Sequence, residues 1–200
     1  MAKIITIWLM LFCVSVLANE KIYTYHKPDG SVVFSNIKPN AEKIVSTLKF
    51  DCYACTKDSS VDWHNTPLFL GKYLSEITQA SQQYAVDQAF IQAVIHAESS
   101  YRPSALSKVG AQGLMQLMPT TAKELGVNNP FNSKENILAG TRYMAKLIKL
   151  FDGDLKLAAA AYNAGASTVK QHGGIPPFEE TQAYVKRVNI LYKRYYIASL

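Results

Sequence analysis

Residues 87–122, DQAFIQAVIHAESSYRPSALSKVGAQGLMQLMPTTA, decide the fold class and locate the candidate chemistry. In the first third of this stretch, Ile91, Val94 and Ile95 recur at helical spacing and give a helix over 87–99 one apolar face. Glu98 follows them by seven, four and three residues and continues that face. We therefore expect a core-facing helix that ends in a carboxylate.

Glu98 has two interpretations. A carboxyl group directed at the protein interior loses water, which disfavours its charged form and raises its pKa. Such a group can act as a general acid near neutral pH. The alternative is a glutamate at a helix end that turns outward into solvent, and the apolar stripe alone slightly favours it. The residues downstream favour the catalytic interpretation.

The segment after this helix predicts one wall of a cleft. Gly110 and Gly113 permit a tight backbone path, while Ser107 and Gln116 supply neutral hydrogen-bonding groups next to apolar side chains such as Met118. This combination suits a sugar, which offers hydroxyl and acetamido groups beside an apolar face. A helix-linking loop with core methionines is the alternative.

Two later stretches predict further parts of the cleft. In AAAAYNAGAS, residues 158–167, small residues let helices approach closely and leave Tyr162 and Asn163 at a helix end. In FEETQAYVKRV, residues 178–188, Tyr184 is a core aromatic by default and a binding residue only if the cleft reaches it.

The fold class follows from the periodicity, which is helical from residue 67 onward with glycines and prolines at the breaks. Ser133 and Asp154 are predicted to begin two of the helices as caps. We expect a mainly α protein with an all-α domain over 61–200. Its predicted helices cover 67–84, 87–99, 119–125, 133–151, 154–163, 166–172 and 178–198.

The first 20 residues, MAKIITIWLMLFCVSVLANE, resemble a secretory signal: Lys3 precedes an apolar run, and cleavage is expected after Ala18. An uncleaved membrane anchor is the alternative, but the run is shorter than the about 20 residues that span a bilayer. We expect residues 1–18 to be a signal peptide and the mature protein to be periplasmic.

Residues 22–35, IYTYHKPDGSVVFS, alternate aromatic or β-branched residues with polar ones around a Pro-Asp-Gly turn and predict a hairpin. An isolated hairpin is marginally stable, so we assign 19–60 to a small β-hairpin module. After signal cleavage its Cys52 and Cys55 remain, an even number in an oxidising compartment, and we expect a short-loop disulfide. Zinc would require two further ligands at recognisable spacing, so no metal is predicted.

The formal net charge of +6 becomes +5 without Lys3, which favours acidic polymers or anionic surfaces as partners. Peptidoglycan and nucleic acid both qualify. The densest basic group, Lys186, Arg187, Lys193 and Arg194, lies on a predicted helix and is interpreted as a solvated face, so no nucleic-acid site is expected.

Four motifs, in order, resemble the lytic transglycosylase domain of the soluble type (SLT domain, glycoside hydrolase family 23), which has a lysozyme-like α-helical fold. The resemblance extends from about 66 to 195. The N-terminal stretch 22–39 resembles, more weakly, a small module of unknown function in exported bacterial proteins. The four motifs are ESSYRPSALSKVGAQGLMQLMPTTA at 98–122, NILAGTRYMAKLIKLF at 136–151, AYNAG at 161–165 and ETQAYVKRV at 180–188.

The resemblance implies that Glu98 is the single catalytic acid and base. Ala166 stands where the family often has proline, and Lys108 stands beside the motif serine, but neither change removes a group that the reaction needs. The resemblance further implies that the other matched positions bind substrate: Ser107, Gln116, Met118, Tyr162, Asn163, Glu180 and Tyr184.

The implied reaction cleaves the β-1,4 bond between N-acetylmuramic acid and N-acetylglucosamine, forms a 1,6-anhydro end and needs no cofactor. Ordinary glycosidases use two carboxyl groups, whereas these motifs supply one, because Asp87 lies about 16 Å along the helix from Glu98. Lysozyme-type hydrolysis and a non-catalytic peptidoglycan-binding protein are the alternatives. A monomer that contacts the cell wall or outer membrane, or assists a secretion, conjugation or pilus machine, is compatible with the same chemistry.

Overall fold

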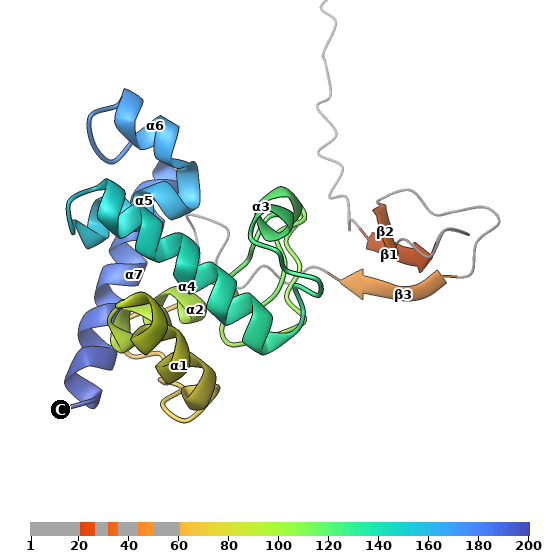
Figure 1. Cartoon of the computed structure of the whole chain (residues 1–200), viewed down its shortest axis with the longest axis horizontal. Coiled ribbons are helices and arrows are strands. Elements are labelled where there is room, and N and C mark those ends of the chain that lie inside the picture. Colours follow the sequence, from red (N-terminus) through yellow and green to blue (C-terminus); the bar gives the residue numbers. More distant parts are fainter. Residues whose placement is uncertain (1–20, 27–31, 36–43, 50–60) are drawn as a thin grey trace, which may run out of the picture. The chain divides into compact units, whose positions relative to one another are not determined.

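The computed structural model describes residues 61–200 with their side chains, and it describes the backbone of three short strands between residues 21 and 49. Figure 1 shows the ribbon of these parts. The chain divides into two units, residues 1–49 and 50–200. The expected signal peptide, the two cysteines Cys52 and Cys55 and the module boundary at residue 60 lie outside the described residues, so these expectations stay predictions.

The first unit contains a three-stranded antiparallel sheet. Strand β1 (Lys21–His26) pairs with β2 (Val32–Ser35) on one side and with β3 (Ile44–Lys49) on the other. The alternating pattern predicts two strands in the stretch 22–35; β1 begins one residue before this stretch and β2 lies within it, while β3 was not predicted.

The second unit is helical, which confirms the mainly α prediction. Among its described residues, no helix is long and apolar enough to cross a membrane. Six of the seven helices begin and end within about one residue of the predicted bounds. The helices are α1 (Leu74–Tyr84), α2 (Gln88–Ser99), α3 (Pro119–Glu124), α4 (Ser133–Leu150), α5 (Leu155–Ala164), α6 (Ala166–Gln171) and α7 (Glu179–Ala198).

Helix α1 differs from its prediction because it begins at residue 74 and not at 67. Tyr73 has a left-handed backbone conformation with φ of +54°, which interrupts helical geometry directly before α1. The preceding segment is fixed by tertiary contacts instead: the backbone N–H of Phe69 donates to the hydroxyl of Tyr195, 3.2 Å away. Apolar periodicity in 67–73 therefore reflects packing outside a helix.

Side-chain caps fix the beginnings of three helices. Asp154 caps α5 as predicted. For α4 the cap is Asn132, whose side chain accepts from the backbone N–H of Glu135 at 3.0 Å, so the predicted cap, Ser133, is the first helical residue instead. Asp87 caps α2. Each cap satisfies backbone donors that the first helical turn leaves without a partner.

Helix α2 is the centre of this unit, since ten of its twelve residues are buried. It packs along α7 and against α1, while α5 packs on α7 and on α4. The buried residues of α2 lie on nearly all sides of the helix and do not form one stripe. Glu98 is therefore half-buried because its helix is central. The largest fully buried side chains of this core include Ile77, Phe90, Ile91, Ile95, Tyr101, Leu114, Met115, Ile137, Met144, Leu191 and Tyr195.

The loop between α2 and α3 is held by one buried side chain of α4. Asn136 accepts from the backbone N–H of Met115 at 2.7 Å and donates to the carbonyls of Gln112 at 3.0 Å and Pro130 at 2.8 Å. Gly113 fits beneath it with φ of +76°, and a Cβ there would lie 2.2 Å from the carbonyl oxygen of Pro130. Close packing thus fixes the loop as one wall of the site.

Candidate active site

One cavity of about 190 Å³ lies where the end of α2, the following loop, the end of α5 and the start of α7 meet. It also touches Ala97, Val109, Ala111 and Arg187. The eight residues that the sequence singled out all line this cavity, although they span 87 positions of the chain: Glu98, Ser107, Gln116, Met118, Tyr162, Asn163, Glu180 and Tyr184.

Glu98 and Tyr184 form the centre of the site. Glu98 is half-buried in the last turn of α2, and the buried hydroxyl of Tyr184 donates to its Oε1 at 2.7 Å. Burial raises the pKa of Glu98 to about 7; the Tyr184 hydrogen bond and the charge of Arg187 oppose this rise, and the charge of Glu180 adds to it. Near neutral pH both protonation states of Glu98 are therefore accessible.

Tyr162 connects α5 to the loop. Its hydroxyl donates to the carbonyl of Met115 at 2.8 Å, and its ring packs on Tyr143 with centroids 5.6 Å apart. Burial, with the charge of Glu98 second, raises the pKa of Tyr162 well above its ordinary value, so the hydroxyl keeps its proton. Tyr184 therefore donates the hydrogen bond to Glu98, whereas Tyr162 holds the loop that forms one wall of the cavity.

Two polar side chains on the loop present different atoms to the cavity. The hydroxyl of Ser107 accepts from the backbone N–H of Ala111 at 3.0 Å, which leaves its own hydrogen for donation. The amide nitrogen of Gln116 donates to the carbonyls of Gly113 at 2.8 Å and Ala105 at 3.1 Å. Both amide hydrogens are thereby used, so Gln116 can offer a ligand only its carbonyl oxygen as an acceptor.

Three of the side chains that line the cavity are exposed, those of Asn163, Glu180 and Met118, and a hydrogen bond fixes the amide of Asn163. Thr181 donates to Oδ1 of Asn163 at 2.8 Å, which joins the end of α5 to the first turn of α7 and leaves the amide hydrogens of Asn163 for a ligand. Glu180 is exposed in the same first turn of α7. Met118, 40% exposed, offers an apolar surface at the start of α3.

Arg187 is the residue of the cavity that sequence analysis assigned wrongly. It was grouped with a solvated basic face, but only 6% of it is exposed. Its guanidinium carbon lies 5.6 Å from the ring centroid of Tyr184 and 5.2 Å from that of Trp63. The available signal was spacing, because Arg187 follows Tyr184 by three residues and Glu180 by seven and so shares their helix face.

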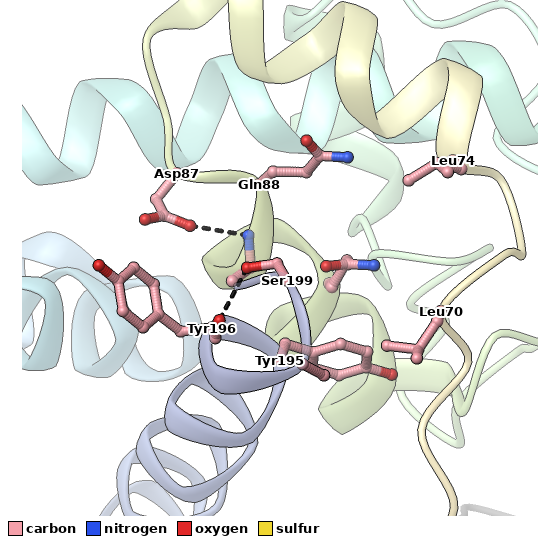
Figure 2. Close-up of a pocket in the computed structure, with 10 residues that line it drawn as sticks. Leu70, Leu74, Asp87, Gln88, Tyr195, Tyr196 and Ser199 are labelled. Atoms are coloured by element: carbon pink, nitrogen blue, oxygen red, sulfur yellow. Dashed lines mark hydrogen bonds between the residues drawn. The ribbon is translucent and has the colours of Figure 1, made fainter.

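A second cavity, of about 440 Å³, lies at the opposite end of the α2 and α7 pair, lined by Leu70, Leu74, Asp87, Tyr195 and Tyr196 among others (Figure 2). None of the eight predicted site residues lines it. The carboxylate of Asp87 there accepts from the backbone N–H of Ala89, and this is one of the hydrogen bonds drawn in Figure 2. Asp87 is therefore a helix cap away from the Glu98 cavity, which agrees with the prediction that it is no partner for that residue.

Known proteins share both the sequence and the fold of the helical unit. Residues 75–185 match the family model described as the transglycosylase SLT domain. The chain is 37% identical over 116 residues to a transglycosylase of Enterobacteria phage PRD1, a match covering 58% of this chain and 43% of the phage protein. It is 34% identical over 157 residues to a putative soluble lytic murein transglycosylase of Haemophilus influenzae, covering 67% of this chain and 26% of that protein.

Solved structures agree with these relatives. An inactive mutant of the lytic transglycosylase Slt from Pseudomonas aeruginosa superposes with a TM-score of 0.60 at 30% identity, over 64% of this chain and 24% of that one. The 70 kDa soluble lytic transglycosylase of Escherichia coli gives 0.57 at 29% identity, over 62% and 24%. The chain thus spans less than half the length of the relatives it matches. Because the family model covers more than half of its 200 residues, the chain belongs to the transglycosylase SLT domain family.

Proposed function

We propose that this protein is a peptidoglycan lytic transglycosylase that cleaves the β-1,4 bond between N-acetylmuramic acid and N-acetylglucosamine and leaves a 1,6-anhydro-muramic end. Glu98 is its acid and base. The observation that carries the proposal is a half-buried carboxyl group with a pKa raised to about 7, hydrogen-bonded at 2.7 Å by Tyr184, in a cavity that is also lined by neutral polar side chains such as Ser107 and Gln116. Membership of the SLT domain family supports it.

In the first step, protonated Glu98 donates its proton to the oxygen that links the two sugars, and the bond from that oxygen to C1 of muramic acid breaks. The positive charge that develops at C1 is stabilised by the acetamido group of the same sugar. Ser107 donates a hydrogen bond and Gln116 accepts one from hydroxyl or acetamido groups, as their hydrogen bonds within the loop allow. Tyr184 stabilises the carboxylate that Glu98 becomes.

In the second step, the carboxylate of Glu98 takes the proton of the C6 hydroxyl of muramic acid. The C6 oxygen attacks C1, closes the anhydro ring and restores protonated Glu98. No water is consumed and no cofactor takes part. The remaining cavity residues, Tyr162, Asn163, Met118 and Glu180, hold the sugar chain in place for both steps.

One observation favours lysozyme-type hydrolysis as a second candidate. Glu180 lines the same cavity as Glu98, and glycosidases that use water employ a second carboxylate at a separation of about 5 to 9.5 Å. In that case Glu180 would activate water and Glu180→Gln would abolish cleavage. In the transglycosylase route Glu180→Gln weakens substrate binding and leaves anhydro products.

Mass spectrometry of the soluble products from peptidoglycan sacculi tests the proposal. Wild-type protein is expected to release anhydro-muropeptides, and Glu98→Gln none, while Glu180→Gln still forms anhydro ends. Products with reducing-end muramic acid would establish hydrolysis. A folded wild-type protein that releases nothing would favour non-catalytic peptidoglycan binding.

The cellular setting belongs to the same proposal. The substrate lies outside the cytoplasmic membrane, so the protein must be exported, with residues 1–18 as its signal peptide. We further propose that the peptidoglycan strand is its partner and that the chain acts as a monomer. Deleting residues 19–60 tests whether that segment docks onto a cell-envelope machine: retained cleavage with lost assembly supports docking, and misfolding supports a structural role.

A further inference from the structure

Arg187 is unusual for an arginine because it is buried and lines the same cavity as Glu98, the candidate catalytic residue. Only 6% of the residue is exposed, and it lines the same cavity as Glu98 and Glu180. Buried charges in proteins are normally paired or solvated by polar groups, because an isolated one is strongly destabilising. A buried cation beside a half-buried carboxyl group therefore points to a role in the site.

Two aromatic rings hold the guanidinium. The ring of Trp63 lies 5.2 Å from it and the ring of Tyr184 lies 5.6 Å from it, both within the range of a cation–π interaction. Trp63 is itself fixed to α7, because Arg194 donates to its backbone carbonyl at 2.9 Å. The segment before α1 thus supplies an aromatic support for a side chain of α7.

Trp63 and Arg187 both lie outside residues 75–185, the range matched by the family model, whereas Glu98 and Tyr184 lie inside it. Arg187 is part of the motif ETQAYVKRV at 180–188, and Trp63 lies before the stretch, from about 66 to 195, over which the resemblance extends.

We propose that Arg187, supported by Trp63, is a positioning residue for Glu98: it holds the ring of Tyr184 in place and offsets the negative charge that Glu98 carries after donating its proton. This role rests on the proposed function of Glu98 as acid and then base. The first step, which ends with a carboxylate on Glu98, is favoured by a fixed cation nearby, since an arginine stays charged at any pH at which the enzyme works.

The charges around Glu98 agree with this role. From α7 it is influenced by Tyr184, Arg187 and Glu180, and from α5 the neighbouring titratable group is Tyr162. Arg187 is the cation among these described groups, and it acts to lower the pKa of Glu98 while Glu180 acts to raise it. Without the Arg187 charge, burial and Glu180 still raise the pKa of Glu98, and among these groups the Tyr184 hydrogen bond alone lowers it.

The test is a pH titration of the Glu98 side-chain carboxyl by carbon NMR on the full chain, its signal assigned by its loss in Glu98→Gln. In Arg187→Met, which keeps an apolar stem against the two rings, the midpoint is expected to rise by about one pH unit, the lower end of what a nearby opposite charge produces. Arg187→Lys keeps the charge and should retain most of the wild-type midpoint. Lys186→Met, an exposed neighbour outside the cavity, is the matched control and should leave the midpoint in place.

Kinetics on sacculi complete the test. In Arg187→Met, kcat is expected to fall by about tenfold with a smaller change in KM, and the alkaline limb of kcat/KM should move upward with the NMR midpoint. A folded Arg187→Met protein with an unchanged midpoint would overturn the positioning role. If that variant does not fold, Arg187→Gln keeps a planar polar group in the buried position and is judged by the same criterion.

The NMR midpoint does not depend on activity, so the two proposals fail separately. A shifted midpoint in a chain without activity on sacculi would support the role of Arg187 toward Glu98 and contradict the proposed function. An active wild type with no shift in Arg187→Met would overturn the role of Arg187 alone.

Discussion

The hydroxyl of Tyr184 donates a 2.7 Å hydrogen bond to Oε1 of Glu98, across 86 positions of the sequence. This bond joins the first half of α7 to the last turn of α2, the central helix of the domain. Burial and the neighbouring Glu98 charge raise the pKa of Tyr184 well above its ordinary value, so the tyrosine remains a donor at any working pH. The carboxyl group therefore has a permanent hydrogen bond that favours its ionised form.

Tyr184→Phe removes this bond while keeping the ring. Because the bond lowers the pKa of Glu98, its loss should raise that pKa above about 7 and move the alkaline limb of kcat/KM to higher pH. The maximal kcat/KM should fall by about 10- to 150-fold, since a hydrogen bond to a charged group contributes roughly 1.5 to 3 kcal/mol. Tyr196→Phe, at the exposed end of α7, is the control. An alkaline limb that stays in place would show that the bond has no electrostatic role.

Asn136→Ala should destabilise the protein by about 3 kcal/mol, because it removes three hydrogen bonds to the backbone and leaves the buried N–H of Met115 without its partner. Asn132→Ala removes the cap of the same helix and should cost about 1 kcal/mol. Urea denaturation of both variants measures the difference. Equal losses would mean that Asn136 does not hold the loop wall.

Sequence periodicity was sufficient for helices α2 to α7 because a capping residue, proline or glycine stands at the start of α2 to α6, and Pro176 and Pro177 stand just before α7. It failed for residues 67–73, where apolar residues pack without helical geometry and Phe69 is held by Tyr195, far away in the chain. The burial of Glu98 was expected on a ground that differs from the one that the structure shows. A single apolar stripe was inferred, whereas α2 is covered on nearly all sides.

For the candidate site too, some features could be predicted from the sequence and others could not. Eight residues could be named from short motifs, yet their hydrogen bonds could not, because Tyr162 and Gln116 bond to loop carbonyls whose positions depend on the folded loop. Arg187 was assigned to the surface since a basic run on a helix is usually solvated. Its burial depends on Trp63, which the sequence gives no reason to place there.

Glu98→Gln should make the protein more stable at alkaline pH while abolishing activity. The folded-state pKa of about 7 exceeds the ordinary value of 4.5, so the contribution of Glu98 to stability is full below pH 4.5 and is lost as the pH rises through 7. The loss is at most roughly 3 kcal/mol. Glutamine does not titrate, so the variant should exceed the wild type in urea denaturation at pH 8 and match it at pH 4.5. Glu76→Gln, on α1 outside the cavity, is the control and should not gain stability over the wild type at pH 8.

His96 lies two residues before Glu98 and should produce the opposite dependence on pH. Burial, with the charge of Arg194 second, lowers its pKa to about 4 from an ordinary 6.5, so its contribution to stability is present above pH 6.5 and is lost as the pH falls through 4. Between about pH 4.5 and 6.5, the Glu98 contribution decreases with rising pH while the His96 contribution increases. Since each group is shifted by a similar amount, the wild-type free energy of unfolding should change little over this interval.

Single variants separate the two contributions. In Glu98→Gln the contribution of His96 remains and that of Glu98 is absent, so the free energy of unfolding should rise with pH across the interval by a few kcal/mol. His96→Gln keeps a polar group near the hydroxyl of Tyr195, which lies 3.0 Å from Nδ1 of His96, and leaves Glu98 alone, so its stability should fall. Urea titrations of the wild type, both single variants and the double variant give the four slopes, and groups common to all four cancel in the comparison. Parallel slopes in the two single variants, equal to the slope of the double variant, which lacks both groups, would show that neither group is shifted in the folded protein. A single variant whose slope alone equals that of the double variant would identify its remaining group as unshifted.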